Sequence, residues 1–156
     1  MPYSDFTKSP LYQLRFPYHF DIPQLIRAAG LPHISDLFFN PFDRALYGLP
    51  VQRVYADKIL LGLRQLTGKD FTYEDLGIAL EDESLPTFQE ARVQHSLTIV
   101  QIAANAALPI ATVERIDEKG EGTLTHIMKA VASLSQLSGM EYKLYENIRG
   151  FLYLKE

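Results

Sequence analysis

Polar capping residues followed by apolar positions at helical spacing occur twice along the chain. Asp21 and Thr98 each precede apolar residues that recur at intervals of three and four, which is the pattern of a short amphipathic helix. These helices are expected to end near Gly30 and Ala107. A Leu-Pro pair follows in both places. Because proline in the first turn of a helix loses no needed N–H, a second short helix is predicted after each pair.

Two longer amphipathic helices are predicted further along, over about 51–67 and about 123–138. Each is followed by a glycine, Gly68 or Gly139, which readily takes the left-handed conformation that ends helices. Both stretches therefore have the length and the end signal of a core helix.

Shorter signals lie between and after these helices. Thr87 and Glu90 have the spacing of a capping box, which predicts another helix running through 93–95. The tails at 71–80 and 141–156 are compatible with short helices or with strands, so their conformation stays open.

The two sets of helices belong to an internal repeat. Residues 21–39 align with 98–116 at an offset of 77, and both contain the Leu-Pro pair. Residues 55–71 align with 126–142 at an offset of 71, and both contain Gln-Leu and a following glycine. The change of offset places an insertion of about six residues in the first copy, around 40–50.

The second copy contains a longer ordered motif over residues 96–134. It has a Thr-capped helix with the small Ala103, a turn at Ala107 and a helix ending in Arg-Ile-Asp at 115–117. A glycine-containing loop and a Leu-rich helix follow. In this order the segment resembles the helix-turn-helix of the lambda-repressor-like, or XRE, transcription regulators. The resemblance implies a DNA-binding unit in the second half and, through the repeat, a degenerate copy in the first.

The expected fold is mainly α, with two tandem lambda-repressor-like helix-turn-helix units and an extended, aromatic N-terminal arm. We expect the arm at 1–16, the first unit at 17–80, an acidic linker at 81–90 and the second unit at 91–156. The formal charge of −4 supports this division, because 81–90 alone sums to −4 and the other three segments cancel.

Docking as in the family would place a recognition helix, from about Pro109 to Asp117, in the major groove of DNA. The resemblance implies outward side chains that face base edges, and polar neighbours that contact phosphates. The base-facing residues would be Ile110, Ala111, Glu114 and Arg115, and the phosphate-contacting residues Gln101, Lys119 and Lys129. A solvated helix face explains Glu114 and Arg115 equally well, and helix capping explains Gln101.

The first copy offers a different surface. The face corresponding to the recognition helix carries His33, Ile34, Leu37 and Phe38, which is typical of a packed face rather than one laid in a groove. The preceding arm is rich in aromatic residues, and prolines at 2, 10 and 17 are expected to interrupt any helix there. Since aromatics at this density are usually buried, we expect the arm to wrap its own unit, or else a second protomer or another protein partner.

Composition removes several function classes. The 156 residues are 47% hydrophobic and 22% charged, as in ordinary globular proteins. There is no cysteine, which excludes disulfides and thiolate chemistry. The sequence has no apolar run of membrane-spanning length and no signal-peptide pattern, so a cytoplasmic protein that does not enter a membrane is expected.

Catalytic motifs are also missing from the sequence. The four histidines are far apart, and no phosphate-binding glycine loop or nucleophile elbow occurs. We therefore expect neither an enzyme nor a cofactor or metal site. The predicted function is a sequence-specific DNA-binding transcriptional regulator that binds double-stranded DNA, and a homo-oligomer is expected. The alternative is a protein-interaction or assembly module that keeps the helix-turn-helix scaffold without binding DNA.

Overall fold

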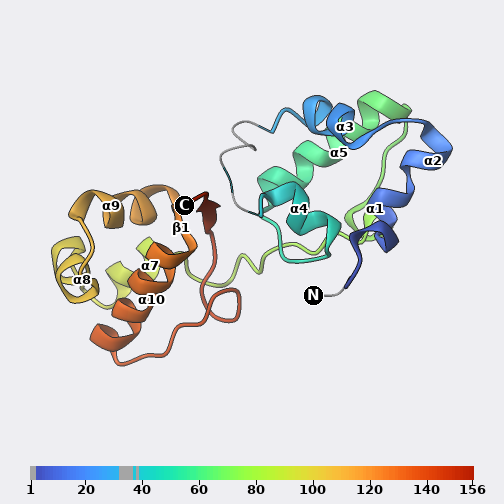
Figure 1. The fold of residues 1–156 in the computed structure, drawn as a ribbon. Coiled ribbons are helices and arrows are strands. Elements are labelled where there is room, and N and C mark those ends of the chain that lie inside the picture. The colour runs from blue at the N-terminus through green and yellow to red at the C-terminus, as the bar shows by residue number, and fades with distance from the viewer. Residues whose placement is uncertain (1–2, 32–36, 38) are drawn as a thin grey trace. The chain divides into compact units, whose positions relative to one another are not determined.

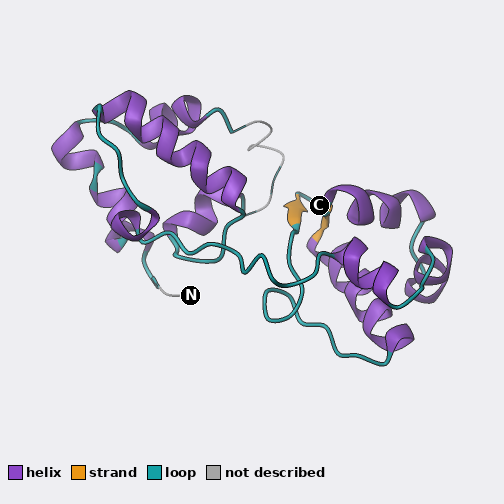
Figure 2. Ribbon diagram, turned by 180° about the vertical axis from the view of Figure 1, so that it is seen from behind, coloured by secondary structure: helices purple, strands orange, loops and turns teal. Residues whose placement is uncertain are grey.

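A computed structural model describes residues 3–31, 37 and 39–156, and in this part of the chain the structure is mainly helical, as expected (Figure 2). The chain divides into two compact units. The first comprises Met1–Ser35 with Phe39–Glu81, and the second comprises Asp36–Phe38 with Asp82–Glu156. Figure 1 colours the first unit from blue to green and the second from yellow-green to red.

The first unit is a cluster of short helices around the long helix α5. Its elements in chain order are η1 (Phe6–Lys8), α1 (Pro10–Gln13), α2 (Arg15–Tyr18), α3 (Ile22–Ala29), α4 (Pro41–Leu46), α5 (Arg53–Thr67) and α6 (Tyr73–Leu76). The core is apolar, and its fully buried side chains include Leu11, Leu25, Phe42, Ile59, Leu63 and Leu76. Helix α3 packs most extensively on α5.

The second unit is built around another long helix, α10. Its elements are α7 (Phe88–Gln94), α8 (Ile99–Ala106), α9 (Ile110–Lys119), β1 (Glu121–Thr123), α10 (Leu124–Ser138) and β2 (Leu152–Leu154). The core contains the fully buried Phe88, Ile102, Ile116, Ile127, Leu134 and Ile148. The strands β1 and β2 pair in parallel, with Glu121 opposite Leu152.

Matching caps open corresponding helices in the two units. Asp21 caps α3 and Thr98 caps α8, and each forms a capping box with a glutamine at the third helical position. Both helices end on a left-handed residue, Gly30 or Ala107. The predicted starts and ends of these helices are therefore confirmed, and so is the capping box that opens α7.

The closing segments of the two units also correspond. In the second unit, Gly122 pairs in parallel with Tyr153, and α10 begins two residues later. In the first unit, Val51 forms an isolated parallel bridge with Leu80, and α5 again begins two residues later. In both units the chain thus returns to lie beside the residues that precede the long helix. The sequence left the conformation of the two tails undecided; the first contains the short helix α6 and a bridge at Leu80, and the second contains β2.

The close approach of two helices differs between the units. A Cβ on Gly62 of α5 would lie 2.7 Å from the backbone nitrogen of Ala29, so only glycine fits at this crossing. The corresponding position of α10 is Ser133, which is buried. Its hydroxyl lies 3.2 Å from the carbonyl oxygen of Ile102 and 2.8 Å from Oδ1 of Asn105. The second unit therefore replaces a backbone contact with a hydrogen-bonded one.

The N-terminal arm is not extended, which corrects the expectation. Residues 6–18 form η1, α1 and α2, because Pro10 and Pro17 fall in the first turn of a short helix, where the N–H has no intrahelical partner. The arm packs on its own unit. Leu11 is fully buried, and the ring of Phe6 makes edge contacts with Tyr12 and Tyr47.

The Leu-Pro helix predicted for the first copy lies outside the described residues, as do His33, Ile34 and Phe38. The insertion around 40–50 is described, and it contains helix α4. Asn40 caps this helix by accepting a hydrogen bond from the backbone N–H of Asp43, and Pro41 occupies its first turn. The extra residues thus add a helix that buries Phe42 in the core of the first unit.

The acidic stretch 81–90, which was expected as a linker, belongs in part to each unit. Glu81 is buried at the end of the first unit, and its backbone N–H donates to the carbonyl oxygen of Val51. The residues that follow dock on the second unit, because Nε of Arg149 donates to the carbonyl oxygen of Leu85 at 2.8 Å. Helix α7 then begins at Phe88.

The packing of the arm predicts a local loss of stability on truncation of its buried side chain. Leu11→Ala should lower the free energy of unfolding of the first unit by about 3 kcal/mol, because it opens a cavity in the core. Native-state amide exchange should speed up in α5 and stay unchanged in α10. Phe16→Ala is the matched control, since Phe16 is 60% exposed and its truncation should change stability by less than about 0.5 kcal/mol. Equal rates of amide exchange in α5 for Leu11→Ala and Phe16→Ala would contradict a structural role for the arm.

Candidate nucleic-acid interface

Helix α9 has one buried face and one exposed face. Val113 and Ile116 are fully buried, and they lie three residues apart on the side that packs into the second unit. The predicted base-facing residues lie together on the opposite side. Ile110, Ala111, Glu114 and Arg115 are all exposed, and so is Lys119 in the last turn of α9. The structure thus brings five of the seven predicted residues onto one helix face.

A buried ion pair fixes the rotation of α9 about its axis. The carboxylate of Asp117, whose side chain is 2% exposed, accepts from Nε of Arg92 at 2.7 Å and from Nη2 at 3.1 Å. Gln89 donates to the same carboxylate at 3.1 Å. The Nη1 group of Arg92 donates to the carbonyl oxygen of Leu97, so the guanidinium also holds the segment between α7 and α8. The acidic residue that ends the Arg-Ile-Asp motif is therefore a structural contact.

The turn between α8 and α9 has a left-handed residue at its centre. Ala107 has φ of 55°, and the backbone N–H of Leu108 donates to the carbonyl oxygen of Ala103, which closes the end of α8. Pro109 then precedes the first residue of α9. This short connection sets the two helices one after the other with their apolar sides in the same core.

Gln101 has a capping role in this structure. Its side-chain oxygen accepts a hydrogen bond from the backbone N–H of Thr98 at 2.8 Å. The hydroxyl of Thr98 in turn accepts from the backbone N–H of Gln101. The capping explanation left open by the sequence therefore accounts for Gln101, and Gln24 makes the same contact with Asp21 in the first unit.

Arg115 makes an ion pair with Glu121 of β1. Both its Nε and its Nη2 contact Oε2 of Glu121, at 3.0 and 2.9 Å. The side chain of Arg115 is 53% exposed, whereas that of Glu121 is 25% exposed. Sequence reasoning missed Glu121, because the pair joins a helix residue to a position beyond the glycine that ends the helix.

The charge of this surface is close to balanced. The side chains of α9 and β1 that reach solvent include two basic residues, Arg115 and Lys119, against the acidic residues Glu114, Glu118 and Glu121. Lys129 is exposed on α10. A surface of this composition attracts a polyanion weakly, so any binding here depends on individual contacts.

Sequence reasoning also missed the partners of Asp117. Arg92 and Gln89 lie on one side of the predicted helix through 93–95, at positions three residues apart. Their polar side chains gave no sign of burial, because the pairing spans 25 residues or more of sequence. An acidic residue in the middle of an otherwise apolar helix face was the signal that could have identified the pair.

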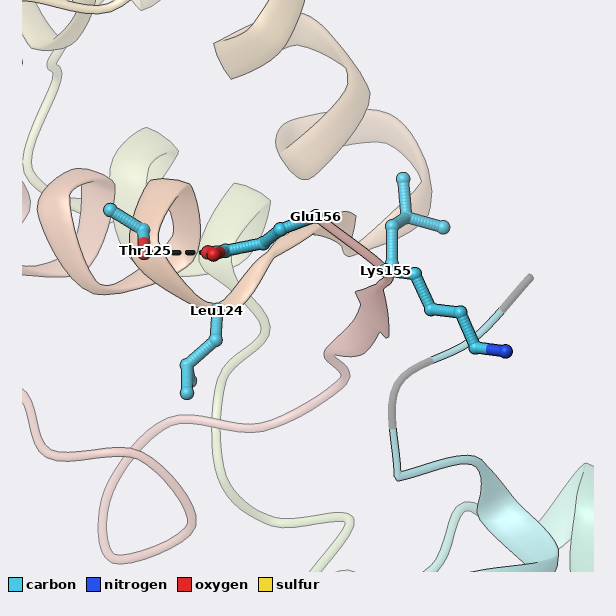
Figure 3. Close-up of a pocket in the computed structure, with 5 residues that line it drawn as sticks. Leu124, Thr125, Lys155 and Glu156 are labelled. Carbon is cyan, nitrogen blue, oxygen red and sulfur yellow. Dashed lines mark hydrogen bonds between the residues drawn. The ribbon is translucent and has the colours of Figure 1, made fainter. Parts of the chain in front are cut away.

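A cavity of about 360 Å³ lies at the start of α10, lined by Leu124, Thr125, Leu154, Lys155 and Glu156. The Thr125 hydroxyl donates to Oε1 of Glu156 at 2.6 Å, and the amino group of Lys155 points away from both (Figure 3). The polar groups are thus engaged with one another or directed elsewhere, and they do not converge on one point in the cavity.

His19, His95 and His126, the histidines in the described residues, form no shared metal site. The ring of His95 lies 2.7 Å from the hydroxyl of Tyr142, and burial raises the pKa of that phenol above its ordinary value. In the described part of the chain, no three metal-binding side chains come together. Among the same residues, no helix combines the length and the apolar character needed to cross a membrane.

Comparisons with known proteins give no relative: no family model, no curated protein and no solved structure matches the chain.

The ion pair beneath α9 predicts a large effect on stability. Asp117→Ala should destabilise the second unit by about 3 kcal/mol in urea unfolding, because it leaves the guanidinium of Arg92 buried without its counter-charge. The double variant Arg92→Met with Asp117→Leu should recover part of this loss. Glu118→Ala, an exposed neighbour, is the control and should cost less than about 0.5 kcal/mol. If Asp117→Ala lowered the free energy of unfolding as little as Glu118→Ala does, the ion pair would not hold α9 in place.

Proposed function

We propose that the chain is a sequence-specific DNA-binding regulator that uses α8, the turn at Ala107 and α9 as a helix-turn-helix. The observation that carries the proposal is the row of exposed residues on α9, opposite a face that the core and Asp117 hold in place. An α-helix with its side chains is about 10–12 Å across, which fits a major groove about 12 Å wide. The ten residues of α9 span about 15 Å at 1.5 Å per residue, so several of its side chains can face the groove.

Each residue of the row offers a contact that the major groove can accept. Ile110 is 47% exposed in the first turn of α9, and with Ala111 it can contact a thymine methyl group. Glu114 can accept from the amino group of cytosine. Arg115 can donate two parallel hydrogen bonds to guanine. The row therefore combines apolar contacts with one acceptor and one donor.

Electrostatics set the expected strength of this binding. Lys119 and Lys129 are the exposed cations proposed to contact phosphates, and the acidic residues of α9 and β1 offset the attraction. We therefore expect modest affinity and a shallow dependence on salt for a single unit. A useful regulator of this kind would bind with both units or as a dimer.

Removal of Arg115 tests the proposal directly. A selection from random duplexes should enrich a motif with the wild-type protein. Arg115→Ala should then lower affinity for that motif by roughly tenfold or more, because it removes a bidentate contact to a base. Affinity would be measured by fluorescence anisotropy at two salt concentrations.

Lys143→Ala is the matched control for this experiment. It removes the same charge from an exposed side chain beyond the far end of α10, and it should leave binding unchanged. Enrichment of no motif, together with no binding at low salt, would refute the DNA-binding proposal. Equal affinity for the wild type and Arg115→Ala would refute the role given to Arg115.

A protein-interaction function is the second candidate, and the exposed apolar side chains of α10 favour it. Leu124, Met128 and Leu137 are 37%, 56% and 38% exposed, and Lys129 is the single charged residue among the exposed positions of this helix. A cavity of about 310 Å³ lies beside Met128. It is also lined by Val131 and Ala132 of α10 and by Tyr142, Lys143 and Leu144 after this helix. A helix with several exposed apolar side chains and a single charge is better suited to another apolar surface than to a phosphate backbone.

A charge placed on α10 tests the second candidate. If α10 is an interface between copies, wild-type protein should show the mass of a dimer in sedimentation equilibrium, and Met128→Glu should show that of a monomer. Ala104→Glu, on the exposed side of α8, is the control and should leave the mass unchanged. A wild-type monomer at all concentrations would exclude a homodimer through this face.

A further inference from the structure

The guanidinium of Arg115 is held on one side only. Glu121 contacts its Nε and one N–H of Nη2 through a single oxygen, Oε2. Arginine has five N–H donors, so both N–H groups of Nη1 and the second of Nη2 remain outside this contact. These are the groups at the outer end of the side chain, and they form the fork that matches the O6 and N7 acceptors of guanine.

The carboxylate that holds Arg115 stands on a constrained piece of backbone. Glu121 lies opposite Leu152 in the β1–β2 pair, and the backbone N–H of Leu152 donates to the carbonyl oxygen of Gly120 at 2.8 Å. Gly120 has φ of +69°, and a Cβ there would lie 1.9 Å from the carbonyl oxygen of Gly150. The residue before Glu121 therefore has room only for glycine, and a backbone hydrogen bond ties it to β2.

The residue after Glu121 is closely packed as well. A Cβ on Gly122 would lie 3.0 Å from Ile116 and 3.2 Å from Ile127, which are both fully buried. The glycine thus lets β1 pass directly over the core between α9 and α10. Glu121 thus lies in a paired strand between two closely packed glycines, and its carboxylate contacts the Arg115 side chain, which would otherwise sample many rotamers.

We propose that Glu121 is a positioning residue that orients Arg115 for bidentate recognition of guanine. The inference rests on the proposed DNA-binding function and deepens it by naming one base and one supporting residue. A restricted side chain loses less conformational entropy on binding, so the pair favours the correct base more strongly than a free arginine would. The cost is the added negative charge of Glu121 near the phosphates, which lowers affinity for all sequences alike.

Glu121 would have the opposite effect if it merely masked Arg115. In that case a base would have to displace the carboxylate, and removal of Glu121 would raise affinity and leave the preference for guanine intact or stronger. A positioning role requires that removal of Glu121 weakens the preference for guanine. The two readings therefore differ in the sign of one measurable change.

The test compares base preference among four variants. The position read by Arg115 is first identified as the one at which Arg115→Ala loses its preference for G·C. At that position Glu121→Ala should lower the preference for G·C over A·T roughly tenfold, within the range of one bidentate contact. Glu121→Gln should keep most of the preference, because its amide oxygen still accepts from Arg115. Glu118→Ala is the matched control, because it removes one negative charge from α9 and should raise affinity for all sequences without changing base preference.

A readout without DNA keeps the inference separate from the function. In ¹⁵N relaxation of the free protein, the Nε–H of Arg115 should be ordered in the wild type and in Glu121→Gln, and mobile in Glu121→Ala. Binding by the wild type with no loss of guanine preference in Glu121→Ala would overturn the positioning role and leave the DNA-binding function standing. An Nε–H that stays ordered in Glu121→Ala would also overturn it. A wild type with an ordered Nε–H that binds no duplex would instead refute the proposed function, and the inference with it.

Discussion

The contact between Arg92 and Asp117 fixes the rotation of α9 about its axis. The buried Val113 and Ile116 set which side of α9 faces the core, but apolar contacts alone tolerate small rotations of a helix of ten residues. The carboxylate of Asp117 removes that freedom, because rotation would separate it from a guanidinium that is only 17% exposed. Breaking such a pair costs about 3–5 kcal/mol. The same guanidinium also binds the carbonyl oxygen of Leu97, so one side chain joins α7, the start of α8 and α9.

The two units solve the same packing problem with different residues. In each, a capped helix of eight residues crosses a helix of fifteen, and a returning segment pairs beside the start of the long helix. The first unit brings the helices together through Gly62, whereas the second separates them enough for the hydroxyl of Ser133. Because these features concern the core, they constrain the backbone without constraining the exposed surface. Conserving the scaffold therefore leaves the surfaces of the two units free to differ.

The sequence predicted local features better than distant pairings. Capping boxes and left-handed ends depend on residues within one turn of each other, so the bounds of α3, α8, α5 and α10 could be predicted to within two residues. The packing of the arm on its own unit was predicted, but its helices were not, because Pro10 and Pro17 were taken as helix breakers, whereas both fall in the first turn of a helix of four residues. The docking of 82–86 could not be predicted, since it depends on Arg149, more than sixty residues away. On α9 the exposed row was predicted from the resemblance to a helix-turn-helix, but the partners of Arg115 and Asp117 lie outside the helix.

The near balance of charge on α9 and β1 limits the contacts through which this surface could bind DNA. A basic surface holds DNA through many phosphate contacts and reads sequence as a small addition to that attraction. Here the acidic residues cancel the general attraction, so nearly all binding free energy would come from directed contacts in the groove. Such contacts are worth most when the side chain is already in place, as Arg115 is beside Glu121. A neutral surface with one fixed donor would bind weakly to random DNA and would lose a large share of its affinity at a single wrong base. Selectivity of this kind suits a chain whose second unit or second copy supplies the remaining affinity.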